Sequence, residues 1–160
     1  MATTQITAAP GLPILEITRE FEASPALLFR AYTDPELLTQ WLGPRTLTMT
    51  VERFDVRDGG TWRFIHRDAD GNEYGFHGVF HGTPSQDGIV RTFEFEGMPG
   101  HVSLESLTFE QRRDRTLVRA VAVFQSVEDR DGMIEGGMEE GVNDGFDRLD
   151  ALLARLVPVT

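Results

Sequence analysis

The chain has 160 residues, 40% of them hydrophobic and 26% charged, which is the balance of one globular domain with a substantial core. Its net charge is −11 and it contains no lysine, so general binding to nucleic acid or to an anionic membrane surface is not expected. It also contains no cysteine, which excludes disulfides and thiolate chemistry.

The N-terminal region predicts one strand followed by two short helices. Residues 1–12 read as a flexible leader before a single domain over residues 13–157. No basic start leads into an apolar run as in a secretion signal, and we expect a cytoplasmic protein. Alternation of side-chain character over residues 14–21 predicts a strand. Ser24-Pro25 and Asp34-Pro35 then each predict a helix start, because serine and aspartate cap a first turn that accepts proline.

From residue 47 to residue 124 the hydrophobic period is two, which predicts strands. Turn signals divide this region into strands linked by hairpins, and they lie at residues 58–60, 70–72, 87–88, 97–100 and 112–115. A change of phase between Leu104 and Leu107 predicts a β-bulge near Glu105. With the N-terminal strand we expect about seven antiparallel strands, in a sheet that twists and curls.

The last long segment, residues 131–156, carries one apolar stripe at helical spacing. Its members are Ile134, Met138, Val142, Phe146, Leu149, Leu153 and Leu156. We expect one helix of about 25 residues and ~38 Å, with Asp129 or Asp131 at its N-terminus. Gly137, Gly141 and Gly145 lie four apart in it. They provide either a smooth strip that a ligand or partner can approach, or sites so crowded by neighbours that only glycine fits.

These elements predict an α+β fold in which the long C-terminal helix lies in the concave side of the curved antiparallel sheet. The two short helices, between the first and second strands, close one end of the curve. If the long helix does not fill the curve, an apolar cavity remains, and such cavities are the usual sites for small molecules.

The order of elements resembles the START-like helix-grip superfamily, and more closely the branch homologous to the C-terminal domain of the activator of the Hsp90 ATPase. The stretches that carry the resemblance are Ile17-Thr18-Arg19-Glu20-Phe21 with Ser24-Pro25, Tyr32-Thr33-Asp34-Pro35-Glu36-Leu37-Leu38-Thr39-Gln40-Trp41, Phe54-Asp55-Val56-Arg57-Asp58-Gly59-Gly60-Thr61-Trp62-Arg63-Phe64, and Gly141 with Phe146-Asp147-Arg148-Leu149. These are scaffold motifs of caps, turns and core, and they place no catalytic group.

The resemblance implies a helix-grip fold and a ligand-binding function. Relatives elsewhere in the superfamily bind lipids, hormones or polyketides, and a few are cyclases or hydrolases. This chain has Val142 where the branch commonly carries tryptophan, which is expected to enlarge the pocket. The additional N-terminal domain of the full-length cochaperone is not found in the sequence, which weakens the inference of an Hsp90 partner.

The candidate cavity wall consists of aromatic and apolar residues that share strand faces or the helix stripe. They are Trp41, Trp62, Phe64, Phe76, Phe93, Phe95, Met138, Val142 and Phe146. Strand phase determines which residues share a face, but not which face looks inward. Plain core is therefore the alternative interpretation for each of them.

Four polar residues are candidates for chemistry in the cavity. His66 shares a face with Trp62 and Phe64 and would act as acid or base near neutral pH, or else point into solvent at the strand end. Arg119 is in phase with apolar neighbours and would neutralise a ligand carboxylate or phenolate, or else be a partly exposed sheet residue. Tyr74 and Glu94 are weaker candidates of the same kind.

No metal or cofactor site is expected. His77 and His81 are four apart, which on a strand is ~13 Å, too far for two ligands of one zinc ion. Gly59-Gly60 lies in a hairpin turn rather than before a helix, so it makes no phosphate-binding loop. The sequence contains no Gly-x-Ser-x-Gly nucleophile motif.

Three functions remain open from the sequence. The first is binding of a small hydrophobic ligand, with aromatic, lipid-like or polyketide-like character, between the sheet and the C-terminal helix. The second is a cyclase or hydrolase that uses the same cavity through His66, Tyr74 or Arg119. The third is a protein-interaction domain of the cochaperone type, and homodimerisation is compatible with all three.

Overall fold

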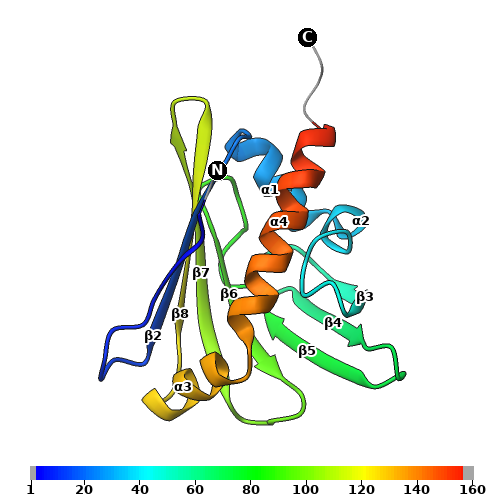
Figure 1. The fold of residues 1–160 in the computed structure, drawn as a ribbon, viewed down its shortest axis with the longest axis vertical. Helices are drawn as coiled ribbons and strands as arrows, with labels where there is room; N and C mark the ends of the chain where they lie inside the picture. Colours follow the sequence, from blue (N-terminus) through cyan, green and yellow to red (C-terminus); the bar gives the residue numbers. More distant parts are fainter. Residues whose placement is uncertain (1–2, 157–160) are drawn as a thin grey trace.

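The computed structural model describes residues 3–156, which form one curved antiparallel sheet with helices on its concave side (Figure 1). The elements are β1 (Gln5–Thr7), β2 (Ile14–Phe21), α1 (Pro25–Thr33), α2 (Pro35–Leu38), β3 (Thr48–Phe54), β4 (Thr61–Arg67), β5 (Glu73–Val79), β6 (Ile89–Phe95), β7 (Val102–Arg112), β8 (Arg115–Val123), α3 (Val127–Glu135) and α4 (Met138–Leu156). The predicted α+β class, the curved sheet and the C-terminal helix are confirmed.

The sheet has eight strands in the order β1-β2-β8-β7-β6-β5-β4-β3. The hairpins from β3 to β8 place neighbours in sequence side by side, while β2 pairs with β8, so that Ile14 lies opposite Val123. Strand β1 falls within the segment predicted as a leader, and it pairs with β2 through Ile6 and Ile17. The sequence did not indicate this strand because three residues are too short for a period to be visible.

Helices α1 and α2 begin where the capping signals predict. The Ser24 hydroxyl accepts a hydrogen bond from the Leu27 N–H at 3.1 Å, and the Asp34 carboxylate accepts one from the Glu36 N–H at 3.0 Å. The Trp41 indole, in the turn after α2, donates to the Ala31 carbonyl at 3.0 Å and ties the two helices together. This helical pair covers one end of the sheet (Figure 1).

The single C-terminal helix predicted over residues 131–156 is wrong, because the chain forms two helices there. The break lies at Gly136 and Gly137, and Gly137 has a φ of +88°, which is left-handed backbone that glycine adopts at little cost. The N-cap of α3 is Ser126, whose hydroxyl accepts from the Asp129 N–H at 3.0 Å, and Asp129 lies in the first turn of the helix.

Glycines of α4 allow the loop after α2 to approach the helix. A side chain at Gly145 would place its Cβ 3.1 Å from the Trp41 carbonyl oxygen and 3.4 Å from the Gly43 nitrogen. A side chain at Gly141 would contact Pro44 at 3.5 Å. At Gly145 the crowded-neighbour interpretation of the glycine strip is therefore the one that holds, although the neighbour is loop backbone rather than sheet side chains.

The β-bulge predicted near Glu105 is wrong. Strand β7 keeps a continuous register with both neighbours, with Glu105 opposite Arg91 on β6 and opposite Ala122 on β8. The change of hydrophobic phase arises because Leu104 lies on the outer face of the sheet, where 44% of its surface is exposed. The observed irregularity lies in β3, where the register shifts between Val51 and Arg53.

Candidate functional site

The strand register identifies the inner face of the sheet, which we define as the face that packs against α4. Phe146 of α4 contacts Phe21 of β2 edge-on, with ring centres 5.3 Å apart. Residues directly opposite one another across antiparallel strands share a face. From Phe21 the inner face therefore continues through the residues Thr116, Val118, Phe109, Leu107, Glu105, Arg91, Phe93, Phe95, Phe76, Phe64, Trp62 and His66.

One end of this inner face is closed by tightly packed side chains. Trp41, Trp62 and Phe64 expose at most 2% of their surface, and Leu149 of α4 exposes none. Phe146 lies between Phe21 and the Trp41 ring, whose centre is 6.5 Å away. Four predicted cavity residues, Trp41, Trp62, Phe64 and Phe146, are thus members of the solid core.

The other part of the inner face is only partly covered. We call it the open part and define it by Phe76, Phe93 and Phe95 of the sheet with Met138 and Val142 of α4, all of which keep some solvent exposure. Val142 is one turn of helix before the buried Phe146, and the apolar residues of α4 are less buried toward its N-terminus. These five residues were predicted to line the cavity, and all five are only partly buried.

The aromatic rings of the open part form a continuous surface. The ring centres of Phe76 and Phe93 are 5.4 Å apart, and those of Phe76 and Phe95 are 5.1 Å apart, with interplanar angles of 31° and 30°. Phe93 in turn lies 5.9 Å from the Trp62 ring. The exposed part of each ring is apolar surface whose burial would be worth about 25 cal/mol per Å², so this row is a candidate place for another molecule to bind.

A polar group lies on the inner face between the open part and the closed end. Arg91 of β6 donates from Nε to Glu105 Oε1 of β7 at 3.0 Å, and its guanidinium carbon lies 4.5 Å from the centre of the Trp62 ring. Burial is the main cause that raises the pKa of the Tyr32 phenol. The charge of Arg91 lowers this pKa and the charge of Glu105 raises it, each by a smaller amount. Tyr32 therefore stays protonated and can donate a hydrogen bond.

Sequence reasoning missed this group, although a signal for it was present. Arg91 alternates in phase with Ile89, Phe93 and Phe95, so it is a charged residue in an apolar row. Glu105 was predicted only as the position of a bulge, and Tyr32 only as part of a scaffold motif. Arg91 and Glu105 are neighbours because of the register between β6 and β7, and the pattern of a single strand does not show that register.

The predicted polar candidates divide between the two faces of the sheet. Arg119 lies on the outer face, where its Nε is 3.3 Å from Glu16 Oε1. The Tyr74 hydroxyl donates to Asp68 in the hairpin between β4 and β5 at 3.1 Å, and Glu94 accepts from the Gly100 N–H. Tyr74 lies directly opposite His66 across β4 and β5 and so shares the inner face with it, whereas Arg119 and Glu94 lie on the outer face.

His66 is buried, contrary to its alternative interpretation as a residue that points into solvent. It exposes 7% of its surface, packs edge-on against Phe76 at 5.3 Å, and its Nδ1 has no hydrogen-bond partner among the described residues. Gly43 lies against the imidazole so closely that a Cβ there would be 2.8 Å from the ring. Burial lowers the pKa of His66 below its ordinary value of 6.5.

This buried imidazole predicts a pH dependence of stability. As the pH falls below about 6.5, the unfolded chain takes up a proton at this position before the folded chain does, so protonation favours unfolding. We expect the free energy of unfolding to be lower at pH 5.5 than at pH 7.5 in the wild type, and less so in His66→Leu, in urea titrations at both values. An equal loss in both proteins would show that other groups cause it. Glu96 is not one of them, because its pKa lies well below this range.

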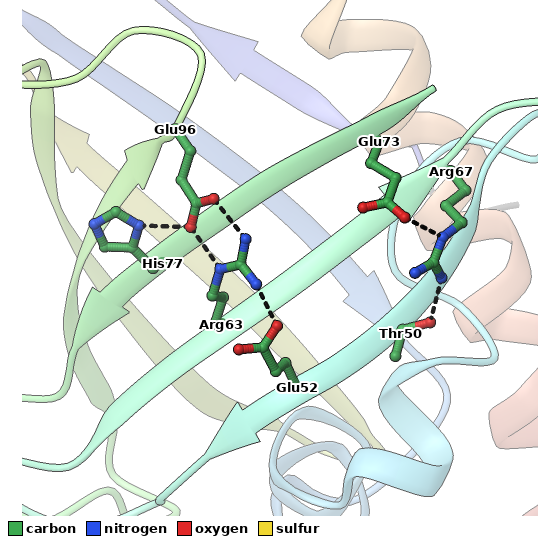
Figure 2. Close-up of polar contacts among 7 residues, drawn as sticks. All are labelled: Thr50, Glu52, Arg63, Arg67, Glu73, His77 and Glu96. Carbon is green, nitrogen blue, oxygen red and sulfur yellow. Dashed lines mark hydrogen bonds and ion pairs between the residues drawn. The ribbon is translucent and has the colours of Figure 1, made fainter. Parts of the chain in front are cut away.

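The outer face of β3, β4, β5 and β6 carries a network of charges (Figure 2). Arg63 donates from Nε and Nη2 to the two oxygens of Glu96, both at 2.7 Å, and also pairs with Glu52. His77 Nδ1 lies 2.9 Å from the same Glu96. The hydrogen bonds from Arg63 are the main cause that lowers the pKa of Glu96 to about 2. The network links adjacent strands, and a hollow of about 320 Å³ lies beside it.

A second hollow, of about 1060 Å³, lies between β1, β2 and α4. Its floor is Arg19, which is 6% exposed and pairs with Asp147 at 3.0 Å and with Asp150. The same guanidinium donates to the Thr4 hydroxyl at 3.3 Å. These contacts join α4 and the residue before β1 to strand β2, which indicates a structural role.

Comparison with known proteins places the fold in a family. The model of the family described as "Activator of Hsp90 ATPase homolog 1-like protein" matches residues 22–154. The chain belongs to this family. A comparison with proteins of curated function finds no significant match.

Solved structures from bacteria share the fold of this Hsp90-activator-like chain. A crystal structure of a Rhodobacter sphaeroides protein has a TM-score of 0.88 at 25% identity, covering 96% of this chain and 99% of that one. A solution structure of an Arthrobacter aurescens protein has a TM-score of 0.86 at 25% identity, covering 94% and 91%. Protein Ms6760 from Mycobacterium smegmatis has a TM-score of 0.85 at 24% identity, covering 96% and 97%.

Two further findings concern this family member over residues 3–156. None of its helices combines the length and the apolar character that crossing a bilayer requires. In the same part of the chain, His, Asp and Glu side chains do not gather in threes in a way that would hold a metal ion.

Proposed function

We propose that this protein binds a small hydrophobic molecule, with an aromatic part, between its sheet and helix α4. The observation that carries the proposal is the contrast between the two halves of the inner face. Leu149 and Trp62 are wholly buried, whereas Phe76, Phe93 and Phe95 remain partly exposed. A molecule placed on these rings would bury apolar surface that the chain itself leaves uncovered.

Val142 is the residue through which α4 controls access to this surface. It is partly exposed and packs at the margin of the core, one helical turn before Phe146. A larger side chain here would project over the open part without disturbing the closed end. The family resemblance points to the same position, because tryptophan is common there in the branch.

Replacement of Val142 by tryptophan is expected to weaken binding at least tenfold while the domain stays folded. The probe is the neutral dye N-phenyl-1-naphthylamine, whose fluorescence rises in apolar surroundings, titrated into wild-type and variant protein. The matched control is Val90→Trp, because Val90 lies on the outer face of β6 and 36% of its surface is exposed. Equal affinity of the Val142→Trp and Val90→Trp proteins for the dye would contradict this location.

Native mass spectrometry of the protein purified from its own host provides an independent test. A retained molecule that is present with the wild type and with Val90→Trp, but absent from Val142→Trp, is the expected result. Retention of the same molecule by all three proteins would show that it binds elsewhere. The wide hollow near Arg19 would then be the next surface to examine.

A further inference from the structure

The polar group of Arg91, Glu105 and Tyr32 lies beside apolar side chains of the core. Arg91 and Glu105 form a cross-strand ion pair on the inner face, where an ion pair is often no better for stability than hydrophobic residues of similar volume. The side chains of Arg91 and Glu105 keep 24% and 32% of their surface exposed. The group therefore borders the open part, where a ligand would meet it.

Arg91 has unused hydrogen-bond donors. A guanidinium carries five N–H groups, and among residues 3–156 the described bond is the one from Nε to Glu105. The two terminal nitrogens have no hydrogen-bond partner in that part of the chain. The guanidinium carbon lies 4.5 Å from the centre of the Trp62 ring and 6.0 Å from the centre of the Phe64 ring, so the aromatic rings restrict where the group can move.

Tyr32 adds a donor from the helical side. Its ring packs edge-on against Trp41 at 4.8 Å and Phe109 at 5.5 Å, which fixes the direction of the hydroxyl. Arg91 and Glu105 are the two charged residues that act on this phenol. A phenol and a guanidinium supply O–H and N–H donors respectively.

The charge of the group distinguishes between ligands. Arg91 and Glu105 sum to zero, so a bound anion would leave a net negative charge in a partly desolvated place beside a carboxylate. A neutral acceptor, such as a ketone or ester carbonyl, adds no charge and still receives hydrogen bonds from a charged donor. The donor set and the charge count thus favour a neutral carbonyl over a carboxylate.

We propose that Arg91 and Tyr32 hold the carbonyl oxygen of a neutral aromatic ligand whose rings lie on Phe76, Phe93 and Phe95. This inference rests on the proposed function and deepens it. Arg91, Phe93 and Phe95 alternate along one face of β6, so that successive side chains are about 7 Å apart. A two-ring aromatic ketone has the length to place its oxygen at Arg91 while its rings cover the phenylalanines.

Three naphthalenes of similar size test the inference by displacement of N-phenyl-1-naphthylamine. They are 2-acetylnaphthalene as the neutral carbonyl, 2-ethylnaphthalene as the hydrocarbon and 2-naphthoate as the anion. In wild-type protein the ketone is expected to bind about tenfold more tightly than the hydrocarbon, as a hydrogen bond to a charged group implies, and naphthoate is expected to bind most weakly. In Arg91→Met the ketone should lose this advantage while the hydrocarbon keeps its affinity within about twofold.

Glu105→Gln provides a second variant that does not depend on removing Arg91. It keeps the side-chain shape but leaves the Arg91 charge unbalanced, so naphthoate should bind at least about tenfold more tightly than to the wild type. If Arg91→Met fails to fold, this gain alone decides the question. An unchanged naphthoate affinity in folded Glu105→Gln would overturn the proposed charge balance.

The outcomes separate the inference from the function on which it rests. Equal binding of ketone and hydrocarbon by the wild type, or a wild-type preference for naphthoate, would overturn the inference while leaving a hydrophobic site in place. Failure of the dye and of all three naphthalenes to bind would overturn the proposed function itself. A ketone preference that disappears in Arg91→Met supports both.

Discussion

Gly78→Ala is expected to destabilise the domain by about 3 kcal/mol or more, because a side chain at this position has no space. An added Cβ would lie 1.9 Å from the Thr92 carbonyl oxygen of the neighbouring strand β6 and 2.7 Å from Trp62 Nε1. The backbone of β6 would have to move away from β5. The same indole nitrogen is already buried with no hydrogen-bond partner among the described residues, so little local bonding is available to offset the shift.

Urea unfolding of Gly78→Ala and Gly132→Ala measures this effect against a matched control. Gly132 lies inside α3, and a Cβ there meets nothing within 4 Å. Alanine is favoured over glycine in a helix by about 1 kcal/mol, so Gly132→Ala is expected to be slightly stabilising. Similar unfolding free energies for Gly78→Ala and the wild type would show that β5 and β6 are less closely packed than described.

Phe146→Ala is expected to reduce the free energy of unfolding by about 3–5 kcal/mol, as for other large aromatic residues removed from a core. Phe146 is 7% exposed and joins α4 to strand β2 and to the turn after α2. Its ring lies 5.3 Å from Phe21, 6.5 Å from Trp41 and 5.8 Å from the Arg19 guanidinium. The cavity left by alanine would face all three.

Met138→Ala, two turns earlier on the same stripe of α4, is the control for this prediction. Met138 is partly exposed in the open part, so its truncation removes little buried surface and is expected to cost about 1 kcal/mol or less. Chemical denaturation of both variants gives the comparison. Losses of equal size would mean that the N-terminal half of α4 is packed as tightly as its C-terminal half.

The strands and short helices were predictable because their signals are local. Ser24-Pro25 and Asp34-Pro35 supply their own caps, and the two-residue period between the turns defines each strand without reference to its neighbours. The break between α3 and α4 was missed for the opposite reason. The apolar stripe continues across Gly136 and Gly137, so the hydrophobic pattern predicts one helix although the backbone makes a left-handed turn at Gly137.

The candidate site was predictable only in part, because a strand pattern does not show which face lies inward. Arg119 was placed in the cavity since it alternates with Leu117, Val121 and Val123. Strand β8 is apolar on both faces, however, and this row is the outer one. Arg91 is on the inner face, opposite Glu105, and only the pairing of three strands reveals that.

The pairing of β2 with β8 has a consequence for how the chain acquires its structure. During synthesis, Ile14 leaves the ribosome long before its partner Val123, and the hairpins from β3 to β8 can form in the interval. Non-local pairing of this kind slows folding, because the entropy of closing a long loop is lost before the stabilising contacts form. Helix α4 emerges last of all, so the aromatic rings of the sheet remain uncovered until translation is almost finished. A chaperone that shields them would be most useful in that period.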